Sequence, residues 1–292
     1  MNQRMTQARL NAMPRKKKRK RIPISKNLRR WLDMIESAIY ATSLKDRLSM
    51  LRQALPTWMK QPHKAILVLD WDSPDQEEVA KFVESAQDGT VHLALAKCRP
   101  LYEHSRCRNI KTALCSLLVP PEEAESQFVF SIDSDIKVRR DPMAEIEEKW
   151  QSRDALYIFG GVVNGWMPHS TGTSVHTIGK FLKAGGCDES MEGWGREDLK
   201  FFEGMTKIGL KLQLDGNIIE HIPHDDRMRT KHCKEKNKWA SNARNGGLML
   251  DPTVIRKRDF SIELRHPSGH SRIISPDDDI YCGKLAEKPF EY

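Results

Sequence analysis

Apolar and polar positions along the first half of the chain predict strands and helices in alternation. Leu48, Leu51 and Leu55 recur at steps of three and four residues, the spacing of one helix face. The segment 65–70, AILVLD, is a continuous apolar run with the length of a buried parallel strand. The same patterns predict strands at 37–43, 65–70, 91–96, 127–132, 210–214 and 217–221, and helices at 28–35, 47–59, 76–86 and 103–118.

Strands that alternate with helices are typical of a parallel sheet with helices on both faces. Ligands of such sheets bind at the carboxyl ends of the strands, so we expect Thr42, Asp70 and the residues 133–135 to line one crevice. The sequence contains neither GxGxxG nor GxxxxGK[ST], which argues against a standard dinucleotide fingerprint and a P-loop. We therefore predict one α/β domain with a mostly parallel central sheet flanked by helices.

The positive charge of the chain is concentrated at its N-terminus. The net charge is +8, from 48 basic and 40 acidic residues, and residues 1–30 hold 12 of the basic residues and no acidic one. The rest of the chain therefore carries 36 basic and 40 acidic residues, or about −4. We predict a disordered basic leader at 1–26, followed by one ordered domain at 27–292.

The run 15–21, RKKKRKR, repels itself and is expected to stay disordered until it meets an anion. Nucleic acid, an anionic membrane surface or an import receptor would each suit it, and a solvated leader without a partner is the alternative. The run has no side chain suited to acid–base chemistry or metal binding. The chemistry is therefore expected elsewhere in the chain.

Composition indicates a globular protein rather than a membrane protein, with 39% hydrophobic and 30% charged residues. The apolar runs are too short to span a bilayer, and no signal peptide is visible at the N-terminus. The six cysteines form no CxxC pair, which argues against a zinc ribbon or a dense disulfide framework and favours reduced thiols. These features predict a cytoplasmic location, with peripheral membrane association through the basic run left open.

The stretch 185–210, GGCDESMEGWGREDLKFFEGMTKIGL, places an aromatic ring beside two carboxylates. Glycines on both sides of Trp194 allow a loop to hold this large ring at its tip. Glu197 and Asp198 fall at the start of an amphipathic run that predicts a helix, where the helix dipole favours ionised carboxylates. A ring that stacks on a sugar and carboxylates that accept hydroxyl protons suit a polyhydroxylated acceptor. The alternative is an ordinary N-capped helix with a core tryptophan.

Asp133-Ser134-Asp135 follows the apolar run FVFSI, which favours a position at the end of a buried strand. Two carboxylates one residue apart can hold a divalent cation and leave positions open for phosphate oxygens. Surface turns explain most Asp-x-Asp pairs, so the spacing alone is a weak signal. His221 and His224 flank an Ile-Pro step after another predicted strand. Either imidazole could complete a manganese-like or zinc-like site, or be a surface residue.

The combination of DSD, GGCDESMEGWGREDLKFF and IIEHIPH resembles the GT-A-fold nucleotide-sugar glycosyltransferases of the β-1,4-galactosyltransferase and bacterial chondroitin-polymerase types. The resemblance covers about residues 37–232, and GWGxED is its most specific element. ATSLKDR, LVLDWDSPD and HSRCRNI are similar to the nucleotide-binding half of the broader inverting family. Arg196 stands where relatives usually carry a second glycine, which implies a stiffer or more cationic acceptor loop. The chain also lacks the membrane anchor of Golgi members, which favours a cytosolic enzyme.

This resemblance implies metal-dependent transfer of a sugar from a nucleoside-diphosphate sugar to a hydroxyl acceptor, such as a glycan or a lipid-linked acceptor, with inversion. It also implies that 27–292 is the catalytic domain, with a nucleotide-binding half at about 37–135, an acceptor and catalytic half at about 136–250 and a C-terminal extension at about 251–292. The implied cofactor is a divalent metal, Mn²⁺ or alternatively Mg²⁺. The resemblance implies that Asp198 is the general base and that Glu197 orients the acceptor, which would contact Trp194, Gly195 and Glu197. The implied nucleotide-sugar contacts are Thr42, Arg47, Asp70, Arg106, Asn109 and Asp133. The implied metal ligands are Asp135, His221 and, directly or through water, Asp133.

Two other function classes fit part of the pattern. A metal-dependent phosphoesterase or nuclease could use DSD and histidine, but such sites normally gather more carboxylates around two metals. A non-catalytic nucleic-acid-binding protein would interleave aromatic with basic residues, but the aromatic content is 7% and the leader has no aromatic residue before Trp31. A sugar transferase that acts on nucleic acid is compatible with both the motifs and the basic run.

Overall fold

The computed structural model describes residues 37–86, 89–97, 104–150, 152, 155–160, 172–189, 191, 197–225 and 261–274. The predicted leader at 1–26 and the predicted helix at 28–35 lie outside these residues. No helix in the described part of the chain is both long enough and apolar enough to cross a membrane.

Most of the described strands belong to one nine-stranded sheet with the order β11-β10-β3-β2-β1-β4-β7-β6-β8, and β5 and β9 form a separate two-stranded ladder. The strands are β1 (Ile39–Leu44), β2 (Ala65–Trp71), β3 (Val91–Lys97), β4 (Phe128–Ser131), β5 (Ile136–Val138), β6 (Ala155–Gly160), β7 (Ser174–Thr177), β8 (Leu210–Asp215), β9 (Ile219–His221), β10 (Ser261–Arg265) and β11 (Ser271–Ile274).

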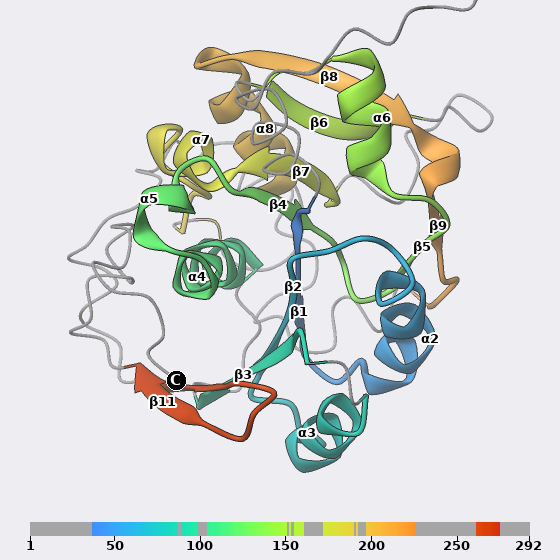
Figure 1. Ribbon diagram of the computed structural model, residues 1–292, viewed down its shortest axis with the longest axis vertical. Coiled ribbons are helices and arrows are strands. Elements are labelled where there is room, and N and C mark those ends of the chain that lie inside the picture. The colour runs from blue at the N-terminus through green and yellow to red at the C-terminus, as the bar shows by residue number, and fades with distance from the viewer. Residues whose placement is uncertain are drawn as a thin grey trace, which may run out of the picture. The chain divides into compact units, whose positions relative to one another are not determined.

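Helices connect the strands of the first half, as the sequence pattern predicts. They are α2 (Leu48–Trp58), α3 (Gln76–Glu84), α4 (His104–Cys115), α5 (Pro121–Ala124), α6 (Pro142–Lys149), α7 (Ile178–Lys183) and α8 (Glu197–Lys207), with 3₁₀ turns η1 (Ser116–Leu118) and η2 (Gly216–Ile218). Figure 1 shows α4 on one face of β1 and β2, with α2 and α3 on the other face. The predicted α/β class is therefore confirmed.

The parallel strands β3, β2, β1 and β4 form the middle of the sheet. Every residue of β2 is buried, which explains the continuous apolar run: both faces of a parallel strand are covered by helices. Apolar side chains of these strands and of α4, among them Leu67, Leu69 and Leu114, pack into one core cluster. This core fixes the carboxyl ends of the strands on which the polar residues lie.

Several antiparallel strands extend this core and were not predicted from the sequence. β7 pairs with β4, and β10 pairs with β3 through the register Ile262↔Ala96. β10 lies within the segment that the sequence analysis treats as a C-terminal extension. The residue register places Leu44 beside Asp70 and Ala41 beside Ser131, so the ends of β1, β2 and β4 meet at one edge of the sheet, as predicted.

Candidate metal and transfer site

Asp135, His221 and His224 bring three potential metal ligands together. Their ligand atoms all lie within 4.8 Å of one another, and no second group of this kind occurs among the described residues. His224 Nε2 lies 2.9 Å from Asp135 Oδ2, and His221 Nε2 lies 3.9 Å from the same oxygen. His221 is the histidine predicted from the sequence as a metal ligand, with His224 as the alternative, and both imidazoles lie at Asp135 in the structure.

The β5–β9 ladder brings these residues together although they are far apart in the sequence. Ile136 in β5 pairs with His221 in β9, and the backbone N–H of Ile222 donates to the carbonyl oxygen of Asp135 at 2.7 Å. The Ile222-Pro223 step then carries the chain to His224. Because the ladder fixes the backbone on both sides of Asp135, the carboxylate and the two imidazoles converge.

The last turn of helix α2 packs against this ladder. The buried indole N–H of Trp58 donates to the carbonyl oxygen of Ile136 at 2.8 Å. The N–H of Val138 donates to the hydroxyl oxygen of Thr57 at 2.9 Å. Strand β5, which begins directly after Asp135, is thus held to α2 by two side-chain hydrogen bonds.

The turn before α2 presents Arg47 to the same carboxylate. Arg47 Nη1 donates to Asp135 Oδ2 at 2.8 Å. Asp46 has a φ of 56°, a left-handed conformation that aspartate tolerates better than most residues. Lys45 Nζ donates to the carbonyl oxygen of Asp72 at 2.7 Å, which ties this turn to the turn after β2. The two strand-end turns therefore hold Arg47 in place.

The Asp135 side chain is only 7% exposed. Burial alone would raise the pKa of its carboxyl group, but the His224 hydrogen bond and the charges of Arg47 and His221 lower it below the ordinary value. The carboxylate is therefore ionised at neutral pH. One carboxylate oxygen and two imidazole nitrogens are a suitable donor set for a manganese-like divalent ion. The residues present fit the metal that the sequence analysis expects.

Asp133 lies apart from this trio and faces α4 instead. Its Oδ1 is 4.0 Å from Arg108 Nη2, and its side chain is 35% exposed. A Cβ atom on Gly172 would collide with Asp133 Oδ2 and would lie 2.6 Å from Arg108 Nη2. Because Gly172 has no side chain, Asp133 and Arg108 can occupy this space and contact each other. Direct metal ligation by Asp133 remains a prediction.

Arg108 is a buried residue of this site that the sequence analysis does not single out. Burial would lower the pKa of its guanidinium, but the surrounding acidic groups, Asp133 first and then including Glu197 and Asp198, raise it above its ordinary value. Arg108 therefore carries a buried positive charge that the neighbouring acidic groups stabilise. The helical spacing of charged residues in HSRCRNIK is the signal that could have identified it.

His104 and Lys111 occupy the same face of α4 as Arg108, because they are four residues before it and three after it. His104 Nδ1 lies 4.0 Å from Glu197 Oε1. Burial, and then the charges of Arg108 and Arg47, lower the pKa of His104 to about 3, so its imidazole is neutral. Burial and Arg108 likewise lower the pKa of Lys111 to about 8. This face of α4 extends from the neighbourhood of Asp133 to that of Glu197.

Glu197 and Asp198 are the first two residues of α8, so they lie at the helix start as predicted. Glu197 is buried at 6% exposure, whereas Asp198 is partly buried. Asp198 Oδ1 accepts a hydrogen bond from the N–H of Leu199 at 2.7 Å. The predicted acceptor residues Trp194 and Gly195 lie outside the described residues.

Asp70 and Thr42 lie at the predicted edge and are both fully buried. Asp70 Oδ1 accepts hydrogen bonds from the N–H of Ser73 at 2.9 Å and from Gln76 Nε2 at 2.8 Å, so this carboxylate shapes the turn after β2. Burial raises its pKa above the ordinary value. Thr42 Oγ1 has no hydrogen-bond partner within the described part of the protein. A nucleoside contact of either residue stays a prediction.

Asn109 and Arg106 are both buried in α4. Asn109 Nδ2 donates to the carbonyl oxygen of Cys187 at 2.9 Å, and the N–H of Cys187 donates to Asn109 Oδ1 at 2.7 Å. Asn109 Nδ2 also donates to Glu189 Oε1 at 2.8 Å. The Asn109 amide thus anchors the segment that precedes α8, and a nucleotide contact of Asn109 or Arg106 stays a prediction.

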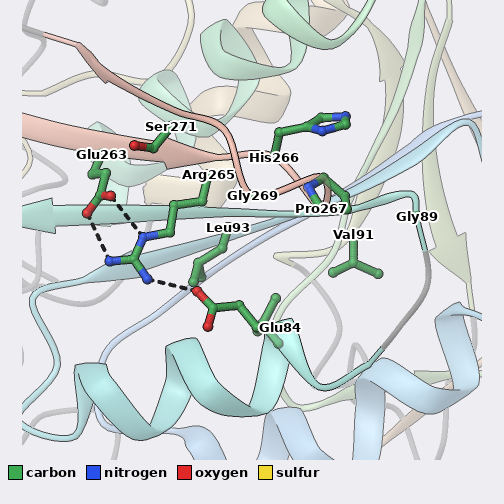
Figure 2. Close-up of a pocket in the computed structure, with 11 residues that line it drawn as sticks. Glu84, Gly89, Val91, Leu93, Glu263, Arg265, His266, Pro267, Gly269 and Ser271 are labelled. Atoms are coloured by element: carbon green, nitrogen blue, oxygen red, sulfur yellow. Dashed lines mark hydrogen bonds and ion pairs between the residues drawn. The ribbon is translucent and has the colours of Figure 1, made fainter. Parts of the chain in front are cut away.

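A separate pocket of about 440 Å³ lies near the other end of β3, and Figure 2 shows its lining. It is formed by the end of α3, the start of β3 and the β10–β11 turn. Its residues are Val83, Glu84, Gly89, Val91, Leu93, Glu263, Arg265, His266, Pro267, Gly269 and Ser271. None of the predicted site residues lines this pocket.

No protein-family model and no curated protein sequence matches the chain. Among solved structures, the chain is similar to the catalytic domain of Drosophila beta1,4-galactosyltransferase 7 in complex with xylobiose, with 16% identity and a TM-score of 0.48 over 72% of this chain and 80% of that chain. A mutant of the same Drosophila protein, in complex with manganese, UDP-Gal and xylobiose, matches with 14% identity and a TM-score of 0.47 over the same shares.

Residues 1–349 of S. aureus TarS match with 15% identity and a TM-score of 0.46, over 61% of this chain and 58% of that chain.

Proposed function

We propose that this protein is a metal-dependent glycosyltransferase of the GT-A type, which moves a sugar from a nucleoside-diphosphate sugar to a hydroxyl acceptor. The observation that supports this most is the convergence of Asp135, His221 and His224 at the carboxyl edge of the sheet. Ligands of sheets of this kind bind at that edge. The family resemblance rests on the motifs DSD, GGCDESMEGWGREDLKFF and IIEHIPH.

Asp135, His221 and His224 would hold the divalent ion, Mn²⁺ in the first instance. When bound, such an ion neutralises charge on a diphosphate leaving group. Asp133 would contact the ribose or reach the ion through water. Arg47 and Arg106 would face the diphosphate, and the remaining predicted nucleotide contacts are Thr42, Asp70 and Asn109.

On the other side of the site, Asp198 would accept the proton of the attacking hydroxyl. Glu197 would hydrogen-bond the acceptor and orient it, together with Trp194 and Gly195. Arg108 supports this assignment because its buried guanidinium interacts favourably with the charges of Asp133, Glu197 and Asp198. Single displacement with inversion at the anomeric carbon follows from the resemblance and is part of the proposal.

A thermal-shift panel tests the proposed function directly. UDP, GDP, ADP and their common sugar conjugates are added with and without Mn²⁺, with UDP-galactose as the first donor. We expect one nucleotide to raise the melting temperature only when Mn²⁺ is present, because a ligand of the folded state stabilises it. The selected donor is then incubated with Mn²⁺ and a mixture of sugar acceptors, and released nucleoside diphosphate is measured. A panel without any metal-dependent shift would contradict the proposal.

The same incubation separates a transferase from a metal-dependent phosphoesterase. A phosphoesterase would hydrolyse phosphate esters without a sugar acceptor, whereas a transferase should release nucleoside diphosphate mainly when an acceptor is present. The described residues contain one metal-ligand group, whereas two-metal hydrolysis needs ligands for a second ion.

Binding of the 15–21 run to an anionic membrane surface or to nucleic acid remains a separate prediction, as does a cytoplasmic location. Deletion of residues 1–26 should leave transfer to a small acceptor unchanged, because none of the proposed chemistry lies there.

A further inference from the structure

Asp135 Oδ2 is the oxygen on which three nitrogen-bearing side chains converge. Arg47 Nη1 lies at 2.8 Å, His224 Nε2 at 2.9 Å and His221 Nε2 at 3.9 Å. The imidazoles can lose a proton and bind a metal, but a guanidinium stays protonated in proteins and has no lone pair to offer. Arg47 therefore occupies the ligand oxygen without being able to join the ligand set.

We infer that Arg47 competes with the divalent metal for Asp135, so that it weakens metal binding in the absence of nucleotide and strengthens binding of the nucleoside diphosphate once the metal is present. This inference rests on the proposed function and adds to it a residue that couples the metal site to the diphosphate site.

The competition follows from charge and burial. The Arg47 and Asp135 side chains are 17% and 7% exposed, so water screens their interaction poorly. A divalent ion bound to the same oxygen would meet the guanidinium charge at close range. Part of the favourable energy of metal binding would then be used to separate Arg47 from Asp135. Removal of the guanidinium charge removes this cost.

The second half of the inference follows from what Arg47 can do after it leaves Asp135. In the described part of the chain, Asp135 is the ion-pair partner that the structure gives to Arg47. The turn around Asp46 keeps the backbone of Arg47 at the carboxyl edge of the sheet. A released guanidinium there matches the paired oxygens of a phosphate group, which a single ammonium group does not. The diphosphate would thus replace Asp135 as the partner of Arg47.

The test is a pair of calorimetric titrations on the full chain and on Arg47→Gln. Mn²⁺ is first titrated into the protein alone, and UDP, or GDP if the thermal-shift panel selects it, is then titrated in saturating Mn²⁺. We expect Arg47→Gln to bind Mn²⁺ about tenfold more tightly and the nucleotide about tenfold more weakly, the size of one charged hydrogen bond. A residue with a merely structural role would weaken both affinities together.

Two variants serve as controls. Arg47→Lys keeps the charge but loses the planar fork, so it should retain the wild-type Mn²⁺ affinity and still lose nucleotide affinity. Arg52→Gln removes an arginine of α2 whose side chain is 54% exposed and that lies beside Glu78, and it should change neither affinity.

Each failure has a distinct meaning. Wild-type protein that binds no Mn²⁺ would overturn the proposed function and this inference with it. Wild-type protein that binds Mn²⁺, together with an Arg47→Gln variant whose Mn²⁺ affinity is unchanged or lower, would overturn the inference and leave the proposed function standing. If Arg47→Gln does not fold, Arg47→Lys decides: a nucleotide affinity equal to that of the wild type would overturn the inference.

Discussion

Two groups of charged side chains, one on β10 of the nine-stranded sheet and one at the β5–β9 ladder, differ in how their charges are balanced. At the pocket in Figure 2, Arg265 donates from Nε and Nη2 to the two oxygens of Glu263 at 3.0 and 3.1 Å, and from Nη1 to Glu84 at 2.8 Å. Each of the three Arg265 nitrogens there donates to a different carboxylate oxygen. At the metal site, one oxygen of Asp135 faces a guanidinium and two imidazoles.

Under the proposed function, the Arg265 network is a set of surface ion pairs, whereas the group around Asp135 is a metal site. Side chains of the Arg265 network are between 30% and 53% exposed, so water competes with each contact and each contributes little. Asp135 is buried, and three nitrogen-bearing side chains share one of its carboxylate oxygens. A metal ion that binds this oxygen would displace the guanidinium and use the two imidazoles as ligands. Substitutions at the two places should therefore have effects of different kind and size.

The largest effect is expected for Asp135→Asn. The amide keeps the shape of the side chain but has no negative charge to hold a divalent ion, and it leaves Arg47 facing two imidazoles. Mn²⁺ binding measured by calorimetry should fall by about a hundredfold or more, and the Mn²⁺-dependent thermal shift with nucleotide should disappear. An unchanged Mn²⁺ affinity in a folded variant would place the metal elsewhere.

The next largest effect concerns the opposite half of the site. Asp198→Asn removes the proposed base and should lower turnover at saturating substrates by about a hundredfold, with donor affinity nearly unchanged. Glu197→Gln should raise the acceptor KM as well. If both carboxylates only cap α8, each variant should lose about 1 kcal/mol of stability and keep its turnover. The rate constant and the melting temperature, measured together, distinguish these outcomes.

A smaller effect is expected for Trp58→Phe, which keeps the aromatic ring but removes the hydrogen bond to Ile136. If this bond positions Asp135, Mn²⁺ affinity should fall by about tenfold, the lower end of what is expected for partners beyond the direct ligands of a metal. The electron paramagnetic resonance spectrum of bound Mn²⁺ should broaden. Tyr157→Phe is the matched control, because it removes a side-chain hydrogen bond of a buried residue to Ser152, at 2.6 Å. Equal Mn²⁺ affinities in both variants would show that Trp58 serves stability alone.

The smallest effect is expected at the pocket. Arg265→Met should change the free energy of unfolding by about 1 kcal/mol or less, because its ion pairs are partly exposed. Mn²⁺ affinity, nucleotide affinity and turnover should all match those of the wild type. Loss of turnover in this variant would mean that the balanced network of the pocket takes part in function, which would remove the contrast between the two places.

The sequence by itself determined the elements whose signal is local. The apolar run at 65–70 predicts β2 because a strand covered on both faces needs no polar side, and the spacing of Leu48, Leu51 and Leu55 predicts α2 because one helix face is buried. The position of Asp135 just after a buried strand, and of Glu197 at a helix start, also follows from neighbouring residues alone.

Tertiary structure decided which distant residues meet. The ladder between β5 and β9 brings both His221 and His224 to Asp135, and α4 directs Arg108 toward Asp133. The antiparallel pairing of β10 with β3 was likewise hidden, since a strand of five residues carries too little pattern to show its partner. These features depend on pairings between residues far apart in sequence, and no local period of apolar and polar positions records such a pairing.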